Sequence, residues 1–69
     1  MNKDNIIGTN VRVARIKKGM TQAELAEKAG VALSTVSFVE NGKHADRRAL
    51  TLSKLANVLG VSVESLLQA

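Results

Sequence analysis

The side chains best suited to contacting another molecule lie in residues 33–38, which read LSTVSF. If this segment is helical, each residue turns by about 100° from the last, so Ser34, Ser37 and Phe38 share one side of the helix. A helix face that meets only water usually carries Lys and Glu, because these residues are better helix formers than Ser. The small, hydroxyl-rich face therefore indicates that another molecule covers it.

Residues able to catalyse a reaction or bind a metal are scarce. The chain has no cysteine, which removes a cysteine nucleophile, a disulfide and a Cys/His zinc site from consideration. Its one histidine, His44, is expected in a loop beside no obvious catalytic partner. The glycines form neither a G-x-G-x-x-G motif nor a P-loop. We therefore expect no enzyme activity, no metal and no cofactor.

A helix is expected to begin directly after Thr21. The Thr21 hydroxyl can accept a hydrogen bond from a free amide of the first turn, while Glu24 reaches back to the Thr21 amide, which is the capping-box arrangement. Apolar residues then recur at helical spacing as far as Ala29. Gly30 follows, where a left-handed cap suits a residue without a Cβ atom. The pattern predicts a helix of about two turns.

A second helix should follow this glycine at once. Val36 and Val39 form its inner face, and it should stop at Asn41-Gly42, since both residues tolerate left-handed geometry. Two short helices joined by a tight glycine turn over residues 21–42 have the geometry of a helix-turn-helix. We therefore expect a protein that binds DNA.

Three more helices are expected around this pair. The first spans about residues 4–18, with Asp4 or a neighbour as N-cap, Gly19 as its stop, and Ile7, Val11 and Ala14 facing inward. A later helix starts near the candidate N-cap Asp46 and buries a stripe of Ala49, Leu52, Leu55, Ala56 and Leu59. Ser62 caps a short last helix with Val63, Leu66 and Leu67 as its apolar set. The fold class is thus a compact five-helix, all-α domain that occupies residues 1–69 as a single unit.

The charge balance favours a polyanionic partner. The chain has 10 Lys and Arg against 6 Asp and Glu, a net charge of +4. One basic cluster lies in the first helix, at Arg12, Arg15, Lys17 and Lys18, and the other follows the helix-turn-helix, at Lys43, His44, Arg47 and Arg48. The two clusters are expected to flank one DNA face. No apolar run approaches a membrane span and the first residues do not form a signal peptide, so we expect a cytoplasmic protein without membrane contact.

A set of residues from position 7 to position 67 matches the pattern of a known family. They are Ile7-Gly8, Arg12, Arg15, Gly19, Met20-Thr21-Gln22, Glu24-Leu25-Ala26, Ala29-Gly30-Val31, Val36-Ser37, Val39-Glu40-Asn41-Gly42-Lys43, Leu52, Leu55-Ala56, Leu59-Gly60-Val61-Ser62 and Leu66-Leu67. At these residues the chain resembles the lambda repressor-like family, the Cro and repressor (XRE-type) helix-turn-helix group.

The resemblance implies two structural contacts. The first is an ion pair between Arg15 and Glu40, which ties the first helix to the end of the recognition helix. The second is a homodimer contact through the last helix, with Leu66, Leu67 and Val63 as candidates. Two departures from the family are the uncapped Ala32, where Ser or Thr is common, and a longer, proline-free connection after Lys43.

The recognition helix is expected to enter the major groove with its N-terminal residues nearest the bases. The base-reading set would be Leu33, Ser34, Thr35, Ser37 and Phe38, in which hydroxyls bond several bases and the apolar residues pack on thymine methyls. Phe38 has two other possible places, turned inward or in a protein interface. Phosphate contacts are expected from residues at helix ends and in the basic clusters, namely Gln22, Thr21, Asn41, Lys43, Arg12, Arg47 and Arg48.

These observations predict a sequence-specific transcriptional regulator. The expected partner is double-stranded DNA, bound as a homodimer on an inverted-repeat operator by a repressor. Alternatives on the same fold are a restriction-modification controller, an antitoxin-type regulator with a protein partner, and a protein-interaction module. The apolar Leu33 and Phe38 on the reading face are the residues that favour the last alternative.

Overall fold

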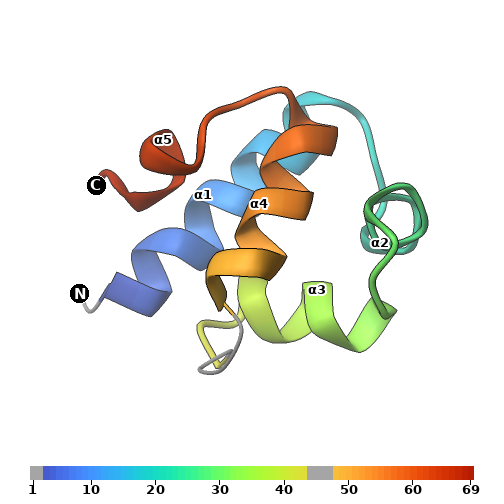
Figure 1. Cartoon of the computed structure of the whole chain (residues 1–69), viewed down its shortest axis with the longest axis horizontal. Helices are drawn as coiled ribbons and strands as arrows, with labels where there is room; N and C mark the ends of the chain where they lie inside the picture. Colours follow the sequence, from blue (N-terminus) through green and yellow to red (C-terminus); the bar gives the residue numbers. More distant parts are fainter. Residues whose placement is uncertain (1–2, 44–47) are drawn as a thin grey trace.

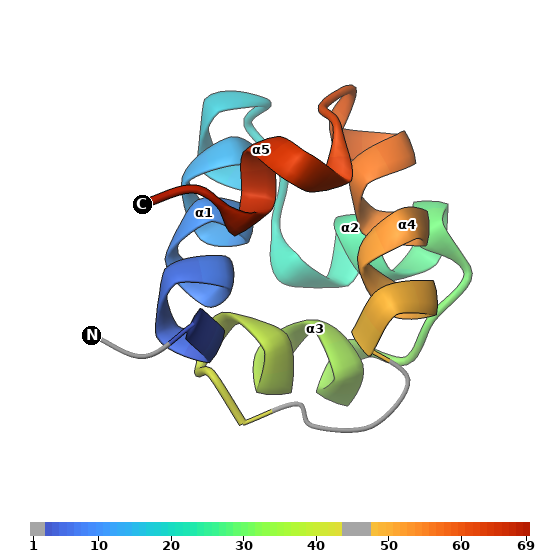
Figure 2. The ribbon, with the colours of Figure 1, turned by 60° about the vertical axis from the view of Figure 1, so that its left-hand side comes forward.

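The protein is described by a computed structural model over residues 3–43 and 48–69, and within these ranges it is built from helices without strands (Figure 1). The helices are α1 (Lys3–Lys17), α2 (Gln22–Ala29), α3 (Leu33–Glu40), α4 (Arg48–Leu59) and α5 (Val63–Leu67). In Figure 2, α3 lies at one end of the molecule and α5 at the other, with α1 and α4 on the two sides between them. The prediction of a five-helix, all-α fold is confirmed.

The core forms where all five helices meet. Its largest fully buried side chains are Ile7, Leu25, Leu55, Val11 and Val36, one or two from each of the first four helices. Leu66 adds the contribution of α5, at 2% exposure. Because the helices are short, their stability depends on this shared apolar contact more than on their own propensity.

The predicted stripe of α4 is correct except at one residue. Leu52, Leu55, Ala56 and Leu59 are buried, but Ala49 is exposed and Thr51 is buried in its place. At the start of α4 the sequence pattern pointed to Ala49 as a buried residue. Alanine is small and uncharged, so it occurs on either side of a helix, and its position could not be decided from the pattern. The candidate N-cap Asp46 lies outside the described residues.

Both predicted ends of α2 are present in the structure. The Thr21 hydroxyl accepts from the Glu24 amide at 3.0 Å, and the Glu24 carboxylate accepts from the Thr21 amide at 2.8 Å. Gly30 ends the helix in the left-handed conformation, with φ 71°. Helix α1 begins at Lys3, so Asp4 lies in the first turn and is not the N-cap. Its negative charge there interacts favourably with the positive end of the helix dipole.

Helix α1 crosses α3 at a glycine. A Cβ atom placed on Gly8 would lie 2.5 Å from the Val39 carbonyl oxygen and 2.7 Å from that of Glu40. Backbone oxygens cannot move aside as a flexible side chain can, so only glycine allows the two helices to approach this closely. This close approach lets α1 and the end of α3 pack directly against each other.

Candidate nucleic-acid interface

Helix α3 presents an uncharged face to solvent. Val36 and Val39 are buried at 0% and 2% exposure, whereas Leu33 and Phe38 on the outer side are 51% and 50% exposed. Ser34 is exposed as well, and Thr35 and Ser37 are half-buried on the flanks. All five predicted base-reading residues are therefore wholly or partly accessible, and Phe38 is not turned into the core.

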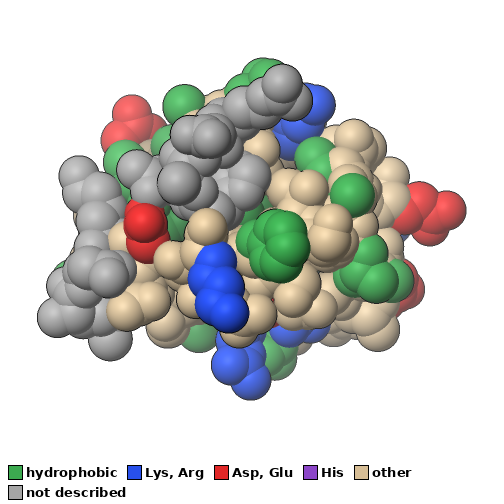
Figure 3. All heavy atoms as spheres, turned by 90° about the horizontal axis from the view of Figure 1, so that it is seen from below, with side chains coloured by type: hydrophobic (Ala, Val, Ile, Leu, Met, Phe, Trp, Pro, Cys, Tyr) green, Lys and Arg blue, Asp and Glu red, His purple; other side chains and the backbone are tan. Residues whose placement is uncertain are grey.

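The face of the molecule that carries α3 is shown in Figure 3. Hydrophobic and uncharged polar side chains occupy much of its middle, Lys and Arg side chains lie below the middle and at the upper edge, and acidic side chains lie to the left and right. A surface of this kind can pack against a partner and donate hydrogen bonds without presenting a central negative charge to phosphates.

The two ends of α3 differ in how they are held. At the start, Ala32 adopts the extended backbone of an N-cap, but its side chain makes no capping hydrogen bond, as expected. At the end, Gly42 adopts the left-handed conformation, with φ 72°, as the sequence allowed. Asn41 does not adopt it, since its φ is −91°. The Asn41 side-chain amide instead donates to the Ser37 hydroxyl over 3.4 Å.

A polar network joins the end of α3 to α1. The Arg15 Nε atom lies 2.6 Å from Glu40 Oε2, and its Nη2 donates to Glu40 Oε1 at 3.1 Å. The third nitrogen, Nη1, donates to the Met20 carbonyl at 2.8 Å, in the turn between α1 and α2. The structure thus contains the ion pair that the resemblance implied, with an added backbone contact.

The network is largely shielded from water. The side chains of Arg15 and Glu40 are 13% and 3% exposed. The hydrogen bonds to Glu40 raise the pKa of Arg15 above its ordinary value, against the opposing effect of burial. A charge removed from either residue would therefore leave the other poorly solvated and uncompensated.

Gln22 belongs to the same network, which the sequence did not indicate. Its side-chain amide donates to Glu40 Oε1 at 3.0 Å. Residues 22 and 40 are far apart along the chain, and no spacing rule connects them. The Gln22 side chain is therefore held by a protein carboxylate at the N-terminus of α2, next to the backbone amides of the helix start.

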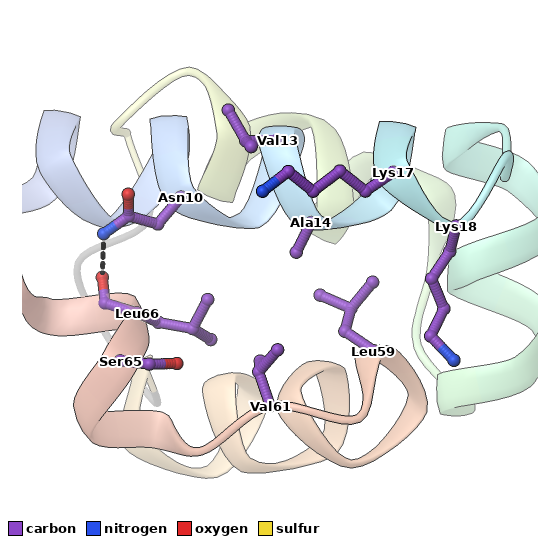
Figure 4. Close-up of a pocket in the computed structure, with 9 residues that line it drawn as sticks. All are labelled: Asn10, Val13, Ala14, Lys17, Lys18, Leu59, Val61, Ser65 and Leu66. Carbon is purple, nitrogen blue, oxygen red and sulfur yellow. Dashed lines mark hydrogen bonds between the residues drawn. The ribbon is translucent and has the colours of Figure 1, made fainter.

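The basic residues predicted to flank the DNA face are only partly placed there. Arg12 and Lys43 are exposed on α1 and directly after α3. Lys17 and Lys18 line a pocket against Leu59 and Val61, at the α4–α5 turn (Figure 4). Arg47 and the Arg48 side chain lie outside the described residues, as does His44.

Within residues 3–43 and 48–69, no three His, Asp or Glu side chains gather in a way that could bind a metal ion. In the same ranges, no helix is long and apolar enough to cross a membrane.

Comparison with known proteins places this arrangement in a family. A family model described as helix-turn-helix matches residues 11–66. The chain belongs to the helix-turn-helix family. The HTH-type relatives of the chain are transcriptional regulators, and this helix-turn-helix protein is accordingly a transcriptional regulator with a DNA-binding fold.

Two relatives with different lengths support the assignment. An uncharacterised HTH-type transcriptional regulator of Archaeoglobus fulgidus is 43% identical over 58 residues, covering 84% of this chain and 81% of the relative. The HTH-type transcriptional regulator SinR of Bacillus subtilis is 42% identical over 62 residues, covering 90% of this chain. The match spans only 56% of SinR, so the helix-turn-helix protein corresponds to about half of that regulator.

Solved structures show the same fold. The structure of SinR in complex with DNA has a TM-score of 0.82 at 42% identity, covering 90% of this chain and 98% of that one. The restriction-modification controller protein C.AhdI from Aeromonas hydrophila has a TM-score of 0.83 at 30% identity, covering 91% of this chain and 94% of that one. The prediction of a lambda repressor-like fold is confirmed.

The dimer candidates on α5 are not equivalent in the helix-turn-helix protein. Leu66 is 2% exposed and packs in the core, so it is not available for a subunit contact, and that prediction is corrected. Leu67 is 39% exposed, and Val63 is half-buried against the core. Helix α5 presents Leu67 outward because Leu66 occupies the one inward position near its end.

Proposed function

We propose that the helix-turn-helix protein binds operator DNA by inserting α3 into the major groove. The observation that carries the proposal is the outward face of α3, where exposed Leu33 and Phe38 alternate with hydroxyl side chains and no carboxylate. Ser34, Thr35 and Ser37 would donate to or accept from base edges, and the two large apolar residues would contact thymine methyls. The similarity to SinR, whose structure includes DNA, supports this orientation.

Contacts to phosphates would fix the orientation of the domain. The backbone amides at the start of α2 and the positive end of its dipole suit an anion beside Thr21 and Gln22. The side-chain amide of Gln22 has two hydrogens, and one of them is donated to Glu40. We assign the other hydrogen to a phosphate oxygen. Exposed Arg12, Asn41 and Lys43 would add contacts, together with Arg47 and Arg48.

We further propose that the functional form is a homodimer that represses transcription from an inverted repeat. One small domain makes few DNA contacts, and two-fold pairing on half-sites about one helical turn apart raises affinity and specificity. Leu67 is the apolar residue of α5 that remains accessible for the subunit contact, with Val63 at its edge. Such a repressor would act in the cytoplasm.

Selection of bound sequences from a random DNA pool tests the proposal. We expect enrichment of an inverted repeat. Sedimentation of the complex should show two copies of the chain bound to it. Leu67→Lys should reduce the affinity for the full repeat while leaving binding to one half-site unchanged. Failure to enrich any sequence, with weak binding that ignores sequence, would contradict the proposal and favour a protein-interaction role for Leu33 and Phe38.

A restriction-modification controller is a second candidate. The supporting observation is the match to C.AhdI, which covers 91% of this chain and 94% of that protein's chain. A controller of this kind can activate as well as repress. A reporter gene placed behind the selected repeat separates the two, because reporter expression falls with added protein for a repressor and rises for an activator.

A further inference from the structure

A shallow apolar groove lies between α1 and the turn that joins α4 to α5. Its volume is about 330 Å³. Figure 4 shows Ala14 pointing into it from α1, and Leu59, Val61 and Leu66 pointing into it from the opposite side. In Figure 2, α5 and this end of α1 lie opposite α3. The groove is therefore separate from the proposed DNA-binding face.

One side of the groove is closed by a fixed polar contact. The side-chain amide of Asn10 donates to the Leu66 carbonyl at 2.8 Å and to the Gln68 carbonyl at 2.6 Å. Both hydrogens of this amide are used, so Asn10 fastens the end of α5 to α1. This contact holds the end of α5 at one side of the groove.

The charges at the groove have one sign. Lys17 and Lys18 both line it, and no acidic residue does among residues 3–43 and 48–69. Glu64, the acidic residue of α5, is outside the lining set. Both lysine side chains are exposed, and Figure 4 shows them at the border of the apolar floor. An occupant that combines apolar side chains with carboxylates matches both the floor and the border.

The size and openness of the groove favour a protein segment over a small molecule. Its volume is at the lower end of the range of roughly 300–1,000 Å³ found for small-ligand pockets, and it opens widely to solvent. Such a site can accept a few apolar side chains from a segment lying across it but cannot enclose a ligand. A second copy of the chain is a poor match, because a two-fold contact centred here would bring Lys17 and Lys18 against their own counterparts.

We propose that this groove is a docking site for an acidic segment of a partner protein, anchored by apolar side chains over Ala14 and Val61 and held by Lys17 and Lys18. The partner binds at the end of the molecule opposite α3, so it can reach the regulator while DNA is bound. This gives the transcriptional regulator a contact for a second protein.

Random peptides displayed on phage and selected against the full chain test the proposal. Enriched peptides should carry Asp or Glu on either side of apolar residues, and their Kd is then measured by fluorescence anisotropy. Lys17→Glu combined with Lys18→Glu should weaken binding by about tenfold or more, since each reversal replaces attraction by repulsion. Lys28→Glu combined with Lys54→Glu, which changes net charge equally at exposed sites outside the groove, should leave Kd unchanged.

A second pair of variants probes the apolar floor. Val61→Thr keeps the side-chain shape but replaces a methyl group in the groove with a hydroxyl. It should weaken peptide binding by about threefold or more. Val58→Thr, a half-buried valine of α4 outside the groove, is the matched control and should have no effect. Circular dichroism of each variant shows that the helices are retained.

Three results would overturn the proposal. They are enrichment of no peptide class or of basic peptides, equal loss of binding in both lysine double variants, and a change in self-association of the chain alone on Val61→Thr in sedimentation. The last would show that a second copy covers the groove. Since peptide binding is measured without DNA, its outcome is independent of the proposed operator binding.

Discussion

The guanidinium of Arg15 holds the carboxylate of Glu40 through two nitrogen–oxygen contacts of 2.6 and 3.1 Å, which join α1 to the last residue of α3. The same carboxylate accepts from Gln22 at the start of α2. One buried charge pair therefore connects the two helices of the helix-turn-helix to the helix that supports them. The orientation of α3 depends on this pair as well as on apolar packing.

Arg15→Ala should destabilise the fold strongly. It leaves Glu40, at 3% side-chain exposure, without its counter-charge, and the loss of one partner from a buried pair costs about 3 kcal/mol or more. For a domain of this size the thermal midpoint should fall by more than about 10 °C. Circular dichroism melting measures it. Arg12→Ala, an exposed arginine on the same helix, is the control, and equal midpoints for the two variants would contradict the role of the pair.

Gly8→Ala should also be destabilising, although alanine is the better helix former by about 1 kcal/mol. The added Cβ atom meets two backbone oxygens of α3, so α1 and α3 must separate. Overpacking of this kind costs about 1–3 kcal/mol, which outweighs the gain in propensity. Urea unfolding of Gly8→Ala, compared with the exposed Thr9→Ala, measures the difference. A stabilised Gly8→Ala protein would show that the helices have room to spare.

Ala32→Ser should stabilise the protein by about 1 kcal/mol. Ala32 already has the extended N-cap backbone, and the added hydroxyl can accept from a free amide of the first turn of α3. Ala32→Val provides the control, because it enlarges the side chain without supplying an acceptor. If chemical unfolding shows no gain for serine over valine, the first turn of α3 does not lack a cap.

The capping box of α2 should make part of the stability depend on pH. Hydrogen bonds from the Thr21 amide and hydroxyl lower the pKa of Glu24 below its ordinary value. A carboxylate with a lowered folded-state pKa stabilises the fold at pH values above its unfolded pKa, and this stabilisation is lost as the pH falls through the folded value. Unfolding free energies of Glu24→Gln should therefore decrease less than those of the wild type on acidification from about pH 6 to about pH 3.

The control for this experiment is Glu27→Gln, which removes the same charge from the same helix without touching Thr21. If the two glutamine variants show the same pH dependence as each other, the effect belongs to net charge and not to the capping box.

Much of the fold could be predicted because its signals are local. Thr21 with Glu24, the glycine at position 30 and the hydroxyl of Ser62 each specify a helix end within a few residues, and all three behave as expected. The outward position of Phe38 followed from helix periodicity alone. The Arg15–Glu40 pair was indicated by the family resemblance rather than by local pattern.

The remaining features depend on contacts between distant residues. The hydrogen bond from Gln22 to Glu40 and the close approach at Gly8 arise only when three helices are assembled. Lys17 and Lys18 are near Arg12 in the sequence, yet a helix spreads these side chains over different faces, and the two lysines line the pocket beside the turn after α4. Between Leu66 and Leu67, periodicity could not decide which faced the core, since α5 is scarcely longer than one turn.

The most direct test of the account is titration of the selected duplex at several salt concentrations with two altered proteins. Ser34→Ala with Ser37→Ala should abolish the preference for the selected sequence, while Lys43→Ala should weaken all sequences equally and reduce the salt slope by about 1. Ser65→Ala on α5 serves as the control and should bind like the wild type. If the Ser34/Ser37 variant keeps its sequence preference, the hydroxyl face of α3 does not read DNA.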